Sequence, residues 1–299
     1  MDKLRLKALA KINLGLDVLR RREDGYHEVR MIMQTVGIYD QIELVRQKEP
    51  GIRVKTNLFY LPENENNLVY KAAKLLMDEF SIEDGVFIDL NKYIPVAAGM
   101  AGGSSDAASV LYGLNRMFQL GLSRRELMER GVSIGADVPY CILRGTALAE
   151  GIGEKLTALP PMPKCWVLVA KPGISVSTKF VYENLHANEL RPEQHPDIDA
   201  VMEGIEAGNL RQTAQAMGNV LELVTAREYP VIEEIKAFMK KQGALNAMMS
   251  GSGPTVFGLF EQKETARRAF HQLQRMNLAK QVYLTQIYNN GTGGKRYDG

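Results

Sequence analysis

A small-residue stretch in the first half of the chain has the composition of an anion-binding loop. It follows an alternating apolar segment at 86–90, which predicts a strand, and precedes small and apolar residues at 107–115, whose spacing predicts a helix. Glycine lacks the Cβ that would hold a ligand away from backbone N–H groups, and a helix N-terminus favours negative charge. The stretch therefore predicts a phosphate site formed by Pro95-Val96-Ala97-Ala98-Gly99-Met100-Ala101-Gly102-Gly103-Ser104-Ser105.

The loop alone is equally consistent with a tight, closely packed turn. It has no lysine after its glycines, so it is not a G-x-x-x-x-G-K-[ST] loop, and the G-x-G-x-x-G pattern is also absent. Ser104, Ser105 and Asp106 are residues that commonly cap helices, and we expect one of them to cap the helix that begins here. If phosphate binds, it does so through a third kind of loop.

Two other segments place polar residues, which are candidates for chemistry, between apolar or small neighbours. Lys11 and Asn13 alternate with apolar residues in a predicted strand, where the pattern by itself favours a lysine that faces solvent. Asp137 follows Gly-Ala and precedes Val-Pro, which indicates a constrained turn. An aspartate in such a turn often only accepts local backbone hydrogen bonds, but its carboxylate is also a candidate general base.

Composition excludes several classes of protein. Hydrophobic residues make up 45% of the 299 residues and charged residues 24%, which is typical of a globular protein. A net charge of +2 argues against nucleic acid as a partner. Cys141 and Cys165 are too few for a disulfide framework. With neither an apolar leader nor an 18-residue apolar run, we expect a cytoplasmic protein with no membrane partner.

The surrounding pattern mixes strands and helices, which predicts an α/β (α+β) fold. One or two strands are expected at 4–18, and further strands at 29–45 with interruptions near Gly37 and residues 39–40, and at 141–149, 166–170 and 281–288. Residues 247–260 are expected to form two strands joined by a glycine turn. Helices are expected at 68–80, 123–130, 178–185, 197–206, 210–224, 230–241 and 265–276. Three prolines in 159–164 indicate a linker between domains 1–158 and 165–288, and 289–299 is expected to be a mobile tail.

Five motifs in a fixed order give the chain a family resemblance. They are the segments 10–14 (AKINL), 24–27 (DGYH), 102–108 (GGSSDAA), 135–139 (GADVP) and 172–178 (PGISVST), and a late glycine turn lies at 249–255. This arrangement resembles the GHMP kinases over nearly the whole chain except its tail. The resemblance implies a two-domain kinase, with an N-terminal ATP-binding domain, a C-terminal substrate domain and an active-site cleft between them.

Within that superfamily the chain resembles the branch that phosphorylates a cytidine diphosphate methylerythritol in the non-mevalonate isoprenoid pathway. The resemblance implies ATP and Mg²⁺, with no protein metal ligand identified, and a small-molecule substrate. It puts Asp137 beside the acceptor hydroxyl as general base and Lys11 next to it. A carboxylate that takes the proton of an alcohol makes it a better nucleophile, and a nearby lysine keeps that carboxylate ionised.

The same resemblance assigns the substrate contacts. Tyr26 and His27 correspond to a cytosine-recognition pair, and Tyr182 corresponds to an aromatic residue that closes the other face of the base. Asn13 and Thr178 correspond to polar substrate contacts. Stacking between rings suits a flat base and contributes about 1–3 kcal/mol per base in single-stranded nucleic-acid sites. An alternative interpretation of Tyr182 is that it is only a helix core residue.

Two other functions remain open from sequence. One is a GHMP kinase for a mevalonate-, sugar- or homoserine-type alcohol, and the other is a nucleotide-binding protein without activity. The aromatic residues argue against the first, and retention of Lys11 and Asp137 argues against the second. The loop departs from the common family pattern because Ala97 and Ala101 replace glycines, and such alanines are strained if the backbone needs a positive φ there. The chain is expected to be a monomer or a homodimer.

Overall fold

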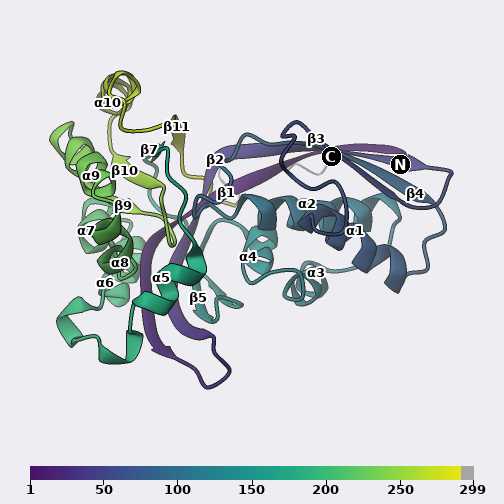
Figure 1. Cartoon of the computed structure of the whole chain (residues 1–299), viewed down its shortest axis with the longest axis horizontal. Helices are drawn as coiled ribbons and strands as arrows, with labels where there is room; N and C mark the ends of the chain where they lie inside the picture. The colour runs from purple at the N-terminus through teal and green to yellow at the C-terminus, as the bar shows by residue number, and fades with distance from the viewer. Residues whose placement is uncertain (291–299) are drawn as a thin grey trace.

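A long antiparallel hairpin, β1 (Lys3–Arg21) and β2 (His27–Gln47), runs through the middle of the molecule (Figure 1). The computed structural model describes residues 1–290. The hairpin is the centre of a seven-stranded sheet with strand order β3-β4-β2-β1-β8, in which β5 also pairs with β2 and β6 with β5. The other strands are β3 (Ile52–Thr56), β4 (Gly85–Asn91), β5 (Thr146–Gly151), β6 (Lys155–Ala158) and β8 (Gly218–Asn219).

The strand β2 runs without a break from His27 to Gln47, so the predicted interruptions of the strand itself were wrong, but its pairing with β1 is irregular between Thr35 and Tyr39. The strand stays extended because β1 pairs with it on both sides of this irregularity, from Lys3 opposite Val45 to Arg21 opposite His27. Gly37 serves a different purpose. A Cβ at this position would lie 2.8 Å from the side-chain oxygen of Thr285, so glycine allows the last strand of the chain to approach the sheet.

Four helices lie along one part of this sheet (Figure 1): α1 (Leu68–Glu79), α2 (Gly102–Met117), α3 (Arg124–Gly131) and α4 (Val138–Leu143). The predicted capping box of α3 is confirmed, because the Ser123 side chain accepts from the Glu126 N–H and the Glu126 side chain accepts in return. The strand predicted at 141–149 was wrong over its first half. Pro139 stands in the first turn of α4, where its missing N–H costs nothing, and β5 begins only at Thr146.

The second sheet has four antiparallel strands in the order β11-β7-β10-β9. They are β7 (Trp166–Lys171), β9 (Asn246–Met249), β10 (Val256–Phe260) and β11 (Gln281–Gln286). The helices of this part gather at the other end of the molecule (Figure 1). They are α5 (Thr178–Asn184), α6 (Ile198–Glu206), α7 (Leu210–Ala216), α8 (Glu222–Glu228), α9 (Val231–Lys241) and α10 (Lys263–Arg275), with 3₁₀ turns at Ala187–Glu189 and Pro192–Gln194.

The single helix predicted at 210–224 was wrong. The chain leaves the helix after Ala216 so that β8 can pair in parallel with Gly15 and Leu16 of β1. The Asn219 side chain then accepts the N–H of Leu221, which helps the chain to turn into α8. Long-range pairing with the first strand thus overrides the helical spacing of the apolar residues.

The two sheets share a buried apolar cluster. Ile12 and Leu14 of β1 lie in it together with Phe257 and Leu259 of β10. At the C-terminal end, Asn289 is buried and donates to the Met162 carbonyl at 2.8 Å, whereas residues 291–299 of the predicted tail lie outside the described residues. Among the described helices, none combines the length and apolar character needed to cross a membrane.

Candidate active site

The small-residue stretch at 95–105, called the glycine-rich loop below, leads directly into α2, as the sequence predicted. The helix begins at Gly102, and its N-cap is Ala101, which makes no side-chain capping hydrogen bond. The expected capping by a serine or aspartate was therefore wrong. The Ser105 hydroxyl instead donates to the Leu9 carbonyl at 2.7 Å, and the Asp106 carboxylate is buried in an ion pair. The start of α2 therefore has no capping side chain at Ala101, which is the arrangement expected where an anion takes the place of the cap.

Three alternate residues of the loop have a positive φ. Ala97 has φ 50°, Gly99 has φ 70° and Ala101 has φ 53°. The two alanines that replace family glycines therefore occupy the left-handed region in which L-residues are strained. The loop keeps the glycine-like backbone path despite these substitutions.

The loop has a packed side and an open side. Ala98, Met100 and Ser105 are buried, so their side chains face the protein core. Ala97 and Gly103 are exposed. A nucleotide phosphate would meet backbone N–H groups on the open side, and little side-chain bulk would block its approach.

Lys11 is buried at 4% exposure, which contradicts the solvent-facing lysine that strand alternation alone favours. Its ammonium donates to the side-chain oxygen of Asn13 at 2.6 Å, and its backbone N–H donates to the Met100 carbonyl at 3.2 Å. The pairing of β1 with β2 shifts register just before Lys11 and just after Asn13. Such irregularities re-aim side chains, so these two residues sit together beside the loop.

Asp137 holds the N-cap position of α4 but makes no capping hydrogen bond, and it is half-buried. The local hydrogen-bonding role that the sequence also allowed is therefore not observed at this helix end. Burial raises the pKa of the neighbouring Cys141 thiol, the charge of Asp137 raises it further, and the charge of Lys11 opposes the shift. Asp137 and Lys11 thus act on one atom although they are far apart in sequence.

The aromatic residues meet at the tip of the long hairpin. The turn is closed by hydrogen bonds from Arg22 N–H to the Tyr26 carbonyl and from Tyr26 N–H to Asp24. The rings of His27 and Tyr182 have centroids 5.1 Å apart and are tilted by 50°. Tyr26 is 61% exposed.

The electrostatic environment differs between the two paired rings. Burial, and secondarily the charge of Arg21, lowers the pKa of His27. Burial, and secondarily the charge of Asp137, raises the pKa of the Tyr182 hydroxyl. The hairpin tip and α5 therefore bring an aromatic pair toward Asp137, with the imidazole favouring its neutral form.

The late glycine turn at 250–253 touches both halves of the site. The Ser250 hydroxyl donates to the Gly99 carbonyl at 2.9 Å, and a Cβ on Gly99 would lie only 2.0 Å from the Ser250 carbonyl oxygen. The Ser252 hydroxyl shares a 2.8 Å hydrogen bond with that of Thr178. The turn thus joins the glycine-rich loop to the start of α5, which also carries Tyr182.

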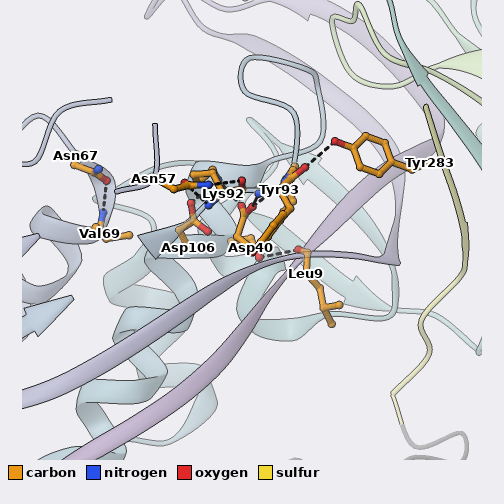
Figure 2. A network of polar contacts seen from close by, with 11 residues as sticks. Leu9, Asp40, Asn57, Asn67, Val69, Lys92, Tyr93, Asp106 and Tyr283 are labelled. Carbon is orange, nitrogen blue, oxygen red and sulfur yellow. Dashed lines mark hydrogen bonds and ion pairs between the residues drawn. The ribbon is translucent and has the colours of Figure 1, made fainter. Parts of the chain in front are cut away.

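Sequence reasoning missed one buried cation beside the loop. Lys92 follows β4, is 8% exposed, and forms ion pairs with Asp40 and Asp106 (Figure 2). A lysine shortly before a glycine-rich loop was the only signal, and it does not reveal burial. Within residues 1–290 no group of three or more His, Cys, Asp or Glu side chains is arranged to hold a metal ion.

Comparison with known proteins identifies the family to which the sequence is similar. Sequence models of the GHMP kinases N terminal domain and of the GHMP kinases C terminal match residues 67–145 and 201–277. A protein of Lachnospira eligens named 4-diphosphocytidyl-2-C-methyl-D-erythritol kinase is 58% identical over 288 residues, which cover 96% of this chain and 99% of the relative.

Solved structures show the same relationship. A crystal structure of 4-(cytidine 5'-diphospho)-2C-methyl-D-erythritol kinase matches with a TM-score of 0.80 and 33% identity, covering 97% of this chain and all of that one. A homoserine kinase from Cytophaga hutchinsonii also reaches a TM-score of 0.80, at 20% identity over 96% of this chain and 95% of that one, which shows the shared fold alone. The chain belongs to the GHMP kinases and, within them, to the family of 4-diphosphocytidyl-2-C-methyl-D-erythritol kinases.

Proposed function

We propose that this chain transfers the γ-phosphoryl group of ATP to the 2-hydroxyl of 4-diphosphocytidyl-2-C-methyl-D-erythritol, as a step of the non-mevalonate isoprenoid pathway. Two relatives named 4-diphosphocytidyl-2-C-methyl-D-erythritol kinase, 58% and 56% identical over nearly the full length, support this choice of substrate. In this proposal ATP is the phosphoryl donor and the protein acts in the cytoplasm. It acts as a monomer or a homodimer.

The glycine-rich loop is the proposed phosphate site. The open N-terminus of α2 and the left-handed backbone at Ala97, Gly99 and Ala101 fit an anion held by N–H groups. Mg²⁺ would arrive bound to the nucleotide phosphates and would neutralise their charge there.

Asp137 is the proposed general base. Its carboxylate is not engaged in capping, is half-buried, and is free to take the proton of the acceptor hydroxyl as the new bond to phosphorus forms. Lys11, fixed by Asn13, would offset negative charge on the transferring group. Phosphoryl transfer needs chiefly positioning and charge stabilisation, and this pair supplies both.

The hairpin tip and α5 are the proposed cytosine site. The neutral imidazole of His27 can donate from one ring nitrogen and accept at the other, which suits the mixed donor and acceptor edge of cytosine. Tyr26 is free to stack on the base, and Tyr182 borders the site beside His27. We propose that residues 1–158 and 165–288 form two domains, with the substrate in the cleft between them.

One observation carries the assignment of the catalytic pair. Lys11 of β1 is buried against the glycine-rich loop, where its backbone N–H donates to the Met100 carbonyl at 3.2 Å, and α4, which has Asp137 at its N-cap, packs against both β1 and α2. The convergence supports a phosphoryl-transfer site rather than a simple nucleotide-binding protein.

The proposal is tested by comparing kcat/KM for ATP-dependent phosphorylation of three acceptors: the cytidine diphosphate methylerythritol, mevalonate and homoserine. We expect the cytidine substrate to be preferred by at least a hundredfold. Equal or better use of either other alcohol would overturn the substrate assignment. ADP release at the same rate without any acceptor would overturn the kinase assignment itself.

A further inference from the structure

The strongest polar feature outside the proposed catalytic pair is the Lys92 network, which consists of Lys92, Asp40 and Asp106. All three residues are buried, at 8%, 0% and 2% exposure. The ammonium of Lys92 lies 2.6 Å from Asp106 Oδ2 and also contacts Asp40 Oδ2. Figure 2 shows the ammonium between the two carboxylates.

The backbone of Lys92 is held as firmly as its side chain. The Asn57 side chain accepts the Lys92 N–H at 2.8 Å and donates to the Lys92 carbonyl at 3.2 Å. Just beyond, the Tyr93 carbonyl accepts from the Tyr283 hydroxyl of β11 at 2.9 Å. Residues from three strands or strand ends therefore converge on the point where the chain enters the glycine-rich loop (Figure 2).

The network also fixes both ends of that loop. At the entrance, Asp40 Oδ1 accepts the N–H groups of Tyr93 and of Ile94, the latter at 2.8 Å. At the exit, Asp106 lies in α2 one turn beyond Gly102. The ammonium itself lies 3.1 Å from the position that a Cβ on Gly102 would take, so it packs directly against the first residue of the helix.

Stability is a poor explanation for this arrangement. Burying two carboxylates and one ammonium is costly, and apolar residues of similar size often stabilise such a position equally well. Asp106 Oδ1 is buried without a hydrogen-bond partner among the described residues, which adds to the cost. A costly network that converges on one loop favours a role in positioning that loop.

We propose that Lys92, held by Asp40 and Asp106, is a positioning residue that keeps both ends of the glycine-rich loop in the arrangement that receives the ATP phosphates. This inference rests on the proposed function of the loop. Loss of the network lets the two loop ends move independently and misaligns the N–H groups of α2. The cytidine site at the hairpin tip does not share these contacts, so its affinity is unaffected.

The test compares Lys92→Met, Asp106→Leu and Asp106→Asn with the wild-type chain. Lys92→Met and Asp106→Leu should raise the Kd for a non-hydrolysable ATP analogue and the KM for ATP at least tenfold. The KM for the cytidine substrate should stay within twofold. Asp106→Asn keeps an oxygen acceptor for the ammonium, so it should restore both ATP constants to within threefold of wild type.

Lys236→Met is the matched control, because Lys236 bridges Glu222 and Glu233 at 2.6 Å each without touching the loop. It should lower Tm and leave the ATP constants unchanged. If Lys92→Met does not fold, the comparison of Asp106→Leu with Asp106→Asn tests the inference. Asp106→Leu still leaves Lys92 in an ion pair with Asp40, so no unpaired charge is buried.

The inference would be overturned if folded Lys92→Met and Asp106→Leu kept the Kd for the ATP analogue and the KM for ATP within twofold of wild type. It would also be overturned if these variants raised the KM for ATP and the KM for the cytidine substrate equally. Failure of the proposed function has a different signature. In that case the wild-type chain binds the ATP analogue but does not phosphorylate the cytidine substrate. The Lys92 and Asp106 variants still show, through the Kd for the analogue, whether the network positions the loop.

Discussion

Asp137 illustrates how a single residue can stand in a structural position without performing the structural task. It lies at the N-cap of α4, where an aspartate commonly accepts N–H groups, yet it makes no such bond. Lys11 is similarly unusual, because it is buried on a strand where alternation favours exposure. Polar side chains that give up favourable local roles are candidates for chemistry.

Replacing Asp137 by Asn tests this interpretation. Because the carboxylate has no capping bond to lose, we expect Tm to change little. The amide cannot accept the hydroxyl proton, so kcat should fall by roughly 10²–10⁴-fold. Steady-state kinetics and a thermal melt of the same preparation measure both quantities. An unchanged kcat would assign Asp137 to structure.

Tyr26 offers a test of base stacking. Tyr26→Ala removes the exposed ring and should raise the KM for the cytidine substrate while leaving the KM for ATP alone. Tyr26→Phe keeps the face of the ring, so its effect should be mild. Michaelis constants for both substrates measure the split, and parallel losses for ATP and the cytidine substrate would argue for ordinary packing.

His27 provides a pH dependence with a defined sign. Its pKa is lowered from the ordinary 6.5, first by burial and then by Arg21, so the neutral ring predominates at pH 7 and the midpoint of its protonation lies below pH 6.5. At saturating ATP, the KM for the cytidine substrate should be constant from pH 8 to about 6.5 and rise in more acidic buffer. His27→Asn should remove this rise. A rise in this KM with its midpoint above pH 6.5 would contradict the assignment.

At the scale of elements, the glycine-rich loop and α2 show what a family pattern can tolerate. Ala97 and Ala101 adopt φ values of 50° and 53°, so the backbone path is retained with side chains that disfavour it. Gly99 has no such latitude, because a Cβ there would lie 2.0 Å from the Ser250 carbonyl oxygen. The loop backbone is thus strained at Ala97 and Ala101, and at Gly99 there is no space for a side chain.

Ala101→Gly should relieve strain. A left-handed L-residue costs roughly 1–2 kcal/mol, and the extra freedom of glycine in the unfolded chain takes back about 0.5–1 kcal/mol. We expect the free energy of unfolding to rise by up to about 1.5 kcal/mol in a denaturant titration. Gly99→Ala is the opposite control and should destabilise the protein. A clear loss of stability in Ala101→Gly would show that the alanine methyl group makes a compensating contact.

The elements that local signals specify were predictable from sequence. Ser123 and Glu126 gave the start of α3, and the apolar periodicity of 68–80 gave α1. Elements set by distant partners were not. The break at Gly218 depends on pairing with β1, and Gly37 is required by the approach of β11. The burial of Lys92 depends on β2, β4 and α2 meeting, which no local pattern encodes.

At the scale of the whole molecule, the proposed active site depends on contacts between segments far apart in the chain. The two sheets share an apolar cluster, β8 extends the larger sheet, and Ser250 reaches the Gly99 carbonyl. Figure 1 shows the long hairpin linking the helices α1–α4 with the helices at the opposite end. The same hairpin carries Lys11 beside the glycine-rich loop and His27 at its tip, so in the proposed function one element contributes to both ligand sites.

Product analysis of a reaction with equimolar ATP and cytidine diphosphate methylerythritol tests the central claim most directly. Phosphorus NMR and mass spectrometry together follow both nucleotides and the position of the new phosphate. We predict one ADP for each cytidine product, with a single phosphoryl group added to the 2-hydroxyl of the methylerythritol. ADP without a phosphorylated cytidine product, or phosphate on a different hydroxyl, would contradict the account.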